Sequence, residues 1–307
     1  MFFDRKLKRQ LEEKDREIAR LRGRMKRLRR RLPERTAAPE NMVWMFGSPR
    51  SGSTWLAGML SFPEGRDLWR EPFFGVVLAL RTKIANQNKL GKKSYLLADA
   101  MKWAWLPSMR NLFLDGVAAR FKNPLSVLIV KEPNSSMSAS LILEAFPESR
   151  MILLVRDPRD VVASQLDASK EGGWYGQEDY EAGALDTGGG SLAERLARQY
   201  VLNIGAAAEA YELHEGPKSF VRYEDLRHDT RSELGRVDGE LGLDAPAEEL
   251  DRAVAKYDWD SVPSKKKGAG KFRRKASPGS WREDLTPDQA RKVEEITAPL
   301  LRKFYTA

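Results

Sequence analysis

The loop that begins at Gly47 has the residue types and spacing needed to hold a phosphate group. It reads Gly47-Ser48-Pro49-Arg50-Ser51-Gly52-Ser53-Thr54 and follows an apolar run, residues 42–46. A buried strand, a glycine-bounded loop and the start of a helix together point backbone N–H groups at an anion. The spacing from Gly47 to Gly52 matches a nucleotide-binding P-loop, but Ser53 replaces the lysine that reaches a triphosphate. Arg50 supplies a cation instead. An ordinary glycine-rich turn is the alternative for this loop taken alone.

A second anion-binding element is expected after the apolar run 151–155. Arg156 follows this run directly, and Asp157-Pro158 suits the N-cap and first residue of a helix. Arg156 would therefore lie at the carboxyl edge of a strand, where open α/β sheets bind ligands. Ser164 lies about two turns into the helix. The two strand ends together predict sites for two phosphates, whereas Arg-Asp-Pro alone is equally typical of a capped helix.

The elements that must position these residues follow from the pattern of apolar runs. Runs at 42–46, 126–130 and 151–155 predict buried parallel strands, and residues 286–303 predict a helix on the outside. The expected fold is a three-layer α/β fold with a mainly parallel sheet and helices on both faces. Cysteine is absent and only His214 and His228 occur, which argues against disulfides, a metal site and a Ser-His-Asp triad.

The net charge of +9 belongs to the N-terminal residues 1–35. This arm has 15 Lys and Arg against 6 Asp and Glu, whereas the rest of the chain has 38 of each sign. Apolar residues in heptad spacing over 7–32, with Lys14 at one seam position, predict a basic helix. We expect it to dimerise as a short coiled coil, to contact an anionic membrane surface, or to remain a solvated tail. Specific nucleic-acid binding is not expected, because no aromatic residues interleave with the charges.

Residues 36–41 are expected to form a linker between this arm and a domain over 42–307. No apolar run approaches the length of about 20 residues that spans a bilayer. The first residues also lack the apolar core of a signal peptide. The sequence therefore predicts a cytoplasmic protein, at most peripheral to a membrane.

Four motifs, in order along the chain, resemble sulfotransferases that use 3′-phosphoadenosine-5′-phosphosulfate (PAPS). Residues 47–55 resemble the family's loop for the 5′-phosphosulfate, and Arg156 with Ser164 resembles its 3′-phosphate site. Residues 222–226, Arg-Tyr-Glu-Asp-Leu, resemble its Tyr-Glu-Asp-Leu near the adenine. Residues 274–282 resemble the segment Arg-Lys-Gly-x-x-Gly-Asp-Trp-Lys that closes over the cofactor, but differ at Ala276, Ser280 and Arg282.

The resemblance implies transfer of a sulfuryl group from PAPS, as co-substrate and without a metal, to a hydroxyl acceptor. A carbohydrate or another small molecule is the favoured acceptor. The implied catalytic residues are Arg50, Glu71 and Lys131. The implied cofactor-binding residues are Arg50, Ser51, Gly52, Ser53, Thr54, Trp55, Arg156, Ser164, Tyr223, Phe272, Arg274 and Lys275.

The catalytic assignments follow the carbohydrate and tyrosylprotein branches of the family. Arg50 is typical of these branches, whereas cytosolic members carry Lys there and use a histidine base that this chain lacks. Glu71 lies 21 residues beyond Arg50, which resembles the tyrosylprotein branch, where the base follows the loop arginine by about twenty residues. Lys131-Glu132-Pro133 resembles the Lys-Asp-Pro of that branch, and Glu132 is the alternative base. The structural alternative for Glu71 is a carboxylate that stabilises the start of a helix. For Lys131 and Glu132 it is a salt-bridged strand end.

Two segments and two other functions remain open. Residues 171–190 contain seven glycines and aromatic residues, which suits either a mobile lid over the acceptor or disorder. Residues 265–275 contain seven cations, which suit a segment that gathers the cofactor's negative charge. A P-loop kinase and a non-catalytic adaptor acting through the basic coiled coil are the alternative functions.

Overall fold

The computed structural model describes residues 38–305 apart from 86–94, 122, 124–125, 171–188, 269 and 272–273. In the N-terminal arm it describes only Lys14, Glu17, Ile18 and Arg20, all helical. The predicted coiled coil over 7–32 and nearly all of the predicted lid therefore lie outside the described residues. The chain divides into two units, residues 1–37 with 111–124, and residues 38–110 with 125–307. The sheet and the candidate site belong to the second unit.

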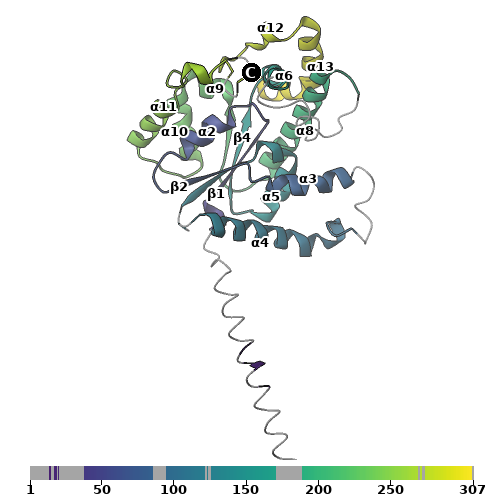
Figure 1. Ribbon diagram of the computed structural model, residues 1–307, viewed down its shortest axis with the longest axis vertical. Coiled ribbons are helices and arrows are strands. Elements are labelled where there is room, and N and C mark those ends of the chain that lie inside the picture. The colour runs from purple at the N-terminus through teal and green to yellow at the C-terminus, as the bar shows by residue number, and fades with distance from the viewer. Residues whose placement is uncertain are drawn as a thin grey trace, which may run out of the picture. The chain divides into compact units, whose positions relative to one another are not determined.

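The second unit is built on a sheet of five parallel strands. Their order is β2-β3-β1-β4-β5, so the first strand in the sequence is the central one (Figure 1). The predicted strands over 42–46, 126–130 and 151–155 are confirmed, each within one residue at either end. The two edge strands had not been predicted. The bounds are β1 Met42–Gly47, β2 Arg66–Arg70, β3 Val127–Lys131, β4 Arg150–Val155 and β5 Lys218–Arg222.

Helices connect the strands and complete the chain. The predicted helix over 286–303 is confirmed as α13. Helix α4 runs through both units, since residues 111–120 belong to the first. The helices are α2 Ser53–Leu60, α3 Phe74–Ala85, α4 Lys102–Arg120, α5 Ala139–Ala145, α6 Pro158–Ala168, α8 Leu192–Leu213, α9 Tyr223–His228, α10 Thr230–Glu240, α11 Ala247–Tyr257, α12 Trp281–Asp284 and α13 Pro287–Tyr305, with short 3₁₀ helices η1 Pro39–Asn41, η2 Asp99–Met101, η3 Pro133–Ser138 and η4 Ser264–Lys266.

Both faces of the sheet are covered, which confirms the predicted three-layer α/β fold. Successive residues of β1 point to opposite faces, and every one of them is buried. Val43 and Met45 belong to a core shared with α2, α10 and α11. Trp44 faces the other way and packs on Phe146, with ring centroids 5.4 Å apart. Figure 1 shows α2, α10 and α11 on one side of the sheet and α5 and α8 on the other. No helix in the described ranges is both long and apolar enough to cross a membrane.

Strand register brings the candidate residues to one edge of the sheet. Met45 of β1 pairs with Lys131 of β3, and Gly47 pairs with Leu154 of β4. Arg70, the last residue of β2, also pairs with Lys131. The carboxyl ends of four neighbouring strands therefore lie together, and each is followed by a segment with a predicted site residue.

Candidate active site

The phosphate loop between β1 and α2 is fixed where it begins and where it ends. The Oγ of Ser136 donates to the carbonyl of Gly47 at 2.6 Å and accepts from its N–H at 2.9 Å. A Cβ at Gly47 would lie 2.6 Å from the carbonyl oxygen of Leu154. Gly52 has φ 92°, and a Cβ there would meet the Tyr223 ring at 2.6 Å. Both glycines of the motif are therefore required, one by close packing and one also by its left-handed backbone.

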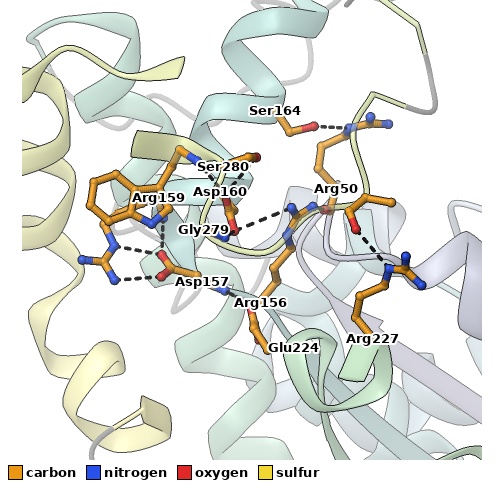
Figure 2. A network of polar contacts seen from close by, with 12 residues as sticks. Arg50, Arg156, Asp157, Arg159, Asp160, Ser164, Glu224, Arg227, Gly279 and Ser280 are labelled. Carbon is orange, nitrogen blue, oxygen red and sulfur yellow. Dashed lines mark hydrogen bonds and ion pairs between the residues drawn. The ribbon is translucent and has the colours of Figure 1, made fainter. Parts of the chain in front are cut away.

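Arg50 lies where the two predicted anion-binding elements meet. Its Nε donates to the Oγ of Ser164 on α6 at 3.0 Å, as Figure 2 shows. A guanidinium N–H of Arg156, at the end of β4, donates to the Arg50 carbonyl at 3.1 Å. Arg50 itself has φ 75°, a left-handed conformation that is uncommon outside glycine. The structure thus joins three predicted cofactor residues that are separated in the sequence.

Two buried polar atoms at this edge have no hydrogen-bond partner within the described part of the chain. They are the Oγ of Ser51 and the Nε of Arg156. The Arg156 guanidinium also lies over Tyr223, with its central carbon 4.4 Å from the ring centroid. Leaving a buried donor unsatisfied costs about 1–3 kcal/mol. A hydroxyl and a guanidinium that need acceptors, beside the start of a helix, fit an anionic ligand with several oxygens.

Asp160 is a residue of this site that the motifs did not single out. It is fully buried on α6, and its carboxylate lies 3.7 Å from the Arg156 guanidinium. It also accepts from the backbone N–H groups of Gly279 at 2.7 Å and of Trp281 at 2.9 Å. Asp160 therefore ties residues 279–281 to the helix that carries Ser164 (Figure 2). A cation, a carboxylate and backbone donors form one network around the predicted 3′-phosphate site.

Glu71 and Lys131 contact each other where the neighbouring strands β2 and β3 end. The Glu71 N–H donates to the Lys131 carbonyl at 2.8 Å, and the Lys131 ammonium forms an ion pair with the Glu71 carboxylate. The same ammonium donates to the Oγ1 of Thr54 at 3.0 Å. Asn134 donates to the second carboxylate oxygen of Glu71 at 3.2 Å. The Glu71 side chain is 32% exposed and that of Lys131 is 6% exposed, so the carboxylate is the group open to an incoming molecule.

Glu132, the alternative base, lies in a different environment. It is fully buried, and its carboxylate accepts from the Phe74 N–H at 2.9 Å and from the Oγ of Ser135 at 2.6 Å. Burial raises the pKa of Glu132 to about 7, a change opposed by these hydrogen bonds. Both carboxylate oxygens bind the start of α3 or the turn after β3. The geometry therefore suits a residue that holds the backbone beyond Glu71 in place.

The whole of this sheet and its loops matches one protein family. Residues 40–305 match the family model described as the sulfotransferase domain. The chain belongs to the sulfotransferase family. The predicted resemblance is therefore confirmed at the level of the family.

Curated relatives match over shorter segments. The chain is 30% identical over 127 residues to protein-tyrosine sulfotransferase 2 of Gallus gallus, a match that covers 41% of this chain and 33% of that protein. It is 30% identical over 117 residues to omega-hydroxy-beta-dihydromenaquinone-9 sulfotransferase Stf3 of Mycobacterium bovis, covering 38% and 29%. The chain thus spans about a third of the length of these curated relatives.

Solved structures of other sulfotransferases share the fold. Mouse sulfotransferase SULT7A1 complexed with PAP has a TM-score of 0.52 at 14% identity, with 87% of this chain and 86% of that chain covered. Sulfotransferase STF9 from Mycobacterium avium also has a TM-score of 0.52, at 16% identity, with 88% and 78% covered.

The segment that resembles the sulfotransferase closing segment, residues 274–282, is held by ion pairs to the short helix α12. Arg274 pairs with Asp284 at 2.6 Å, and Lys275 pairs with Glu283 at 2.9 Å. The structure therefore places these two predicted cofactor residues in ion pairs with α12. Ala276 has φ 53°, the left-handed conformation that the family's glycine would adopt without strain. Phe272 lies outside the described residues.

The remaining predicted cofactor residues line the region between the loop and α9. Trp55 and Tyr223 meet edge to face, with centroids 6.1 Å apart. The Arg227 guanidinium lies 5.8 Å from the centre of the Trp55 ring and donates to the Ala276 carbonyl at 3.0 Å. These contacts link the closing segment to the predicted adenine site. Arg227 follows directly after the Tyr-Glu-Asp-Leu motif, and this position was the only sequence signal that could have drawn attention to it.

Proposed function

We propose that the chain transfers a sulfuryl group from PAPS to a hydroxyl of an acceptor molecule, through its domain over 42–307. The observation that carries this proposal is a pair of buried donors, on Ser51 and Arg156, that have no hydrogen-bond partner among the described residues. Family membership and the similarity to a sulfotransferase solved with PAP support the same donor. The curated relatives are named for protein tyrosine and for an omega-hydroxylated dihydromenaquinone, two hydroxyl-bearing acceptors.

Three sets of residues would hold the donor, which supplies the reactive sulfuryl group and a good leaving group. Ser51, Gly52, Ser53 and Thr54, with the backbone N–H groups at the start of α2, suit the phosphosulfate. Arg156 and Ser164 suit the 3′-phosphate, while Trp55 and Tyr223 suit the adenine. Among the described residues, no group of three or more His, Cys, Asp and Glu is arranged to hold a metal ion.

Residues at the ends of β2 and β3 would supply the general base and a cation for the transfer. Glu71 would accept the proton of the acceptor hydroxyl, whose oxygen then forms the new bond to sulfur. Lys131 and Arg50 would face the negative charge that develops on the phosphate oxygen as its bond to sulfur breaks. Lys131 contacts both the Glu71 carboxylate and Thr54 of the loop, so one cation links the base to the leaving group. Positioning and electrostatics are sufficient for such an in-line transfer.

Binding experiments separate this proposal from the kinase alternative. Titration calorimetry should show that the full chain binds adenosine 3′,5′-bisphosphate and does not bind ATP. Binding of ATP without binding of the bisphosphate would refute the sulfuryl donor and favour phosphoryl transfer. A screen of hydroxyl compounds with ³⁵S-labelled PAPS would then find acceptors, and product formation would exclude the adaptor alternative.

The base is tested with Glu71→Gln, which keeps the shape and removes the charge. We expect kcat to fall by about 10²–10⁴ while the affinity for adenosine 3′,5′-bisphosphate stays unchanged. Glu132→Gln is the comparison, because the Glu132 side chain is fully buried and both of its carboxylate oxygens already accept hydrogen bonds. Full turnover by the Glu71 variant would show that another group removes the proton.

The N-terminal arm is proposed to act outside the reaction. Its heptad spacing and its charge of +9 over residues 1–35 suit a homodimer or contact with an anionic membrane surface. Sedimentation of the full chain, with and without vesicles of phosphatidylserine, distinguishes the two uses of the arm.

A further inference from the structure

Three apolar side chains at the start of α3 are exposed together. Phe73 is 51% exposed, Val76 is 43% exposed and Val77 is 50% exposed. Val76 and Val77 lie on the exposed side of α3, and Phe73 is the residue directly before the helix begins at Phe74. Phe74 and Leu78, one turn apart on the inner side of the helix, are 7% and 0% exposed and pack into the core. The start of α3 and the residue before it thus carry three exposed apolar side chains, which we call the α3 stripe (Phe73, Val76 and Val77).

The α3 stripe begins beside the proposed base. Phe73 lies two residues after Glu71, whose partly exposed carboxylate is held by Lys131 and Asn134. The buried carboxylate of Glu132 binds the Phe74 N–H at 2.9 Å and so anchors the start of the helix. The base and the stripe are therefore parts of one short, firmly held segment between β2 and α3.

The backbone of this segment is strained at both of its outward-facing residues. Glu71 has φ 50° and Phe73 has φ 55°, on either side of Pro72. Such left-handed conformations cost energy in residues with a side chain, and they cluster at ligand-binding and catalytic sites. Glycine or asparagine would relieve the strain at position 73. Position 73 is instead a phenylalanine whose side chain is half exposed. The next residue, Phe74, packs on Trp44, with ring centroids 6.2 Å apart.

We propose that the acceptor is an alcohol with an apolar portion next to its reacting hydroxyl, and that this portion lies on the α3 stripe. The inference rests on the proposed sulfuryl transfer and narrows its acceptor class. An apolar body on Phe73 and Val77 would leave the hydroxyl near Glu71, two residues earlier in the chain. A bare sugar would leave the stripe in water.

The probes are primary alcohols from 1-butanol to 1-octanol, which differ only in apolar length. Full burial of one methylene would raise affinity about fourfold, and burial on one side only would raise it about twofold. We therefore expect kcat/KM with ³⁵S-labelled PAPS to rise about twofold for each added methylene. Calorimetry on the full chain saturated with adenosine 3′,5′-bisphosphate should show the same trend in alcohol affinity, independently of turnover.

Two variants remove the apolar surface without changing the backbone. The double variant Val76→Thr/Val77→Thr preserves shape, and Phe73→Asn introduces a residue that tolerates a left-handed conformation. In both variants the increase of kcat/KM for each added methylene should fall from about twofold towards no increase. The affinity for adenosine 3′,5′-bisphosphate should stay unchanged. Leu213→Ser is the matched control, since Leu213 is 71% exposed at the end of α8 and should leave the dependence intact.

The outcomes separate this inference from the function on which it rests. If the bisphosphate binds but the alcohols show no chain-length dependence, or none binds, the apolar acceptor is refuted and sulfuryl transfer stands. If the bisphosphate does not bind, the proposed function itself fails. A double variant that dissociates a dimer in sedimentation, with the chain-length dependence unchanged, would assign the stripe to an interface between copies and also refute the proposal.

Discussion

Replacing Glu132 by glutamine should abolish a measurable part of the dependence of stability on pH. Burial raises the pKa of this carboxyl from 4.5 to about 7 in the folded protein. Between these values the folded protein keeps a proton that the unfolded chain has already released. Raising the pH through this window therefore favours unfolding, and the stabilising contribution of the protonated form is lost as the pH passes 7.

The size of the effect follows from the two pKa values. Between pH 5 and pH 8 the ionisation of Glu132 should lower the free energy of unfolding by about 2.5 kcal/mol. Glutamine cannot ionise, but its amide oxygen can still accept from the Phe74 N–H, and its amide N–H can donate to Ser135. The variant should thus gain about 2.5 kcal/mol relative to the parent over this range.

The assay is urea denaturation of the parent and Glu132→Gln at half-unit steps from pH 5 to pH 8. The difference between the two free energies of unfolding is the relevant quantity, because other buried acids such as Glu224 contribute equally to both proteins. A difference that stays constant with pH would show that Glu132 is already ionised, or that the unfolded chain titrates in the same way. A decrease with pH would reverse the sign and refute the burial argument.

Three further predictions concern the cofactor site and the arm. Arg156→Ala should weaken adenosine 3′,5′-bisphosphate binding by about 10- to 100-fold in calorimetry, since it removes a charged donor, and should leave the protein folded. The control Arg231→Ala, which breaks an exposed ion pair, should bind normally, and an unfolded Arg156 variant would favour a structural role. Ala276→Gly should raise the free energy of unfolding in urea by about 0.5–1 kcal/mol by relieving the left-handed backbone, and a lower value would contradict this. Deleting residues 1–35 should leave bisphosphate affinity within about twofold and alter sedimentation, whereas loss of binding would show that the arm supports the site.

The central strands could be predicted from the sequence because they are buried on both faces. Strands β1, β3 and β4 are continuous apolar runs, and the structure confirms them within a residue. Strand β2, Arg66–Arg70, escaped prediction because an edge strand with charged residues at both ends has no such run. Glu71 was therefore found by its distance from Arg50 and by family resemblance, without the strand that carries it.

The contacts within the site were less predictable, because they join segments far apart in the chain. The Gly47–Gly52 spacing predicted the loop, which is a local feature. The hydrogen bonds that Asp160 accepts from Gly279 and Trp281, and the one that Asn134 donates to Glu71, depend on sheet register and on the path of the closing segment. The ion pairs of Arg274 and Lys275 with α12 likewise depend on a turn whose left-handed residue, Ala276, is not one that sequence patterns mark.

The central place of β1 has a consequence for biosynthesis. This strand leaves the ribosome first among the five, but its two neighbours, β3 and β4, end only at Lys131 and Val155. At about 5–20 residues per second, the apolar run from Met42 to Phe46 waits roughly 5 to 20 s before both of its partners exist. During that interval its hydrogen-bonding edges are open to other nascent chains. We therefore expect the yield of folded protein to depend on chaperones that act in this interval, before the catalytic centre has formed.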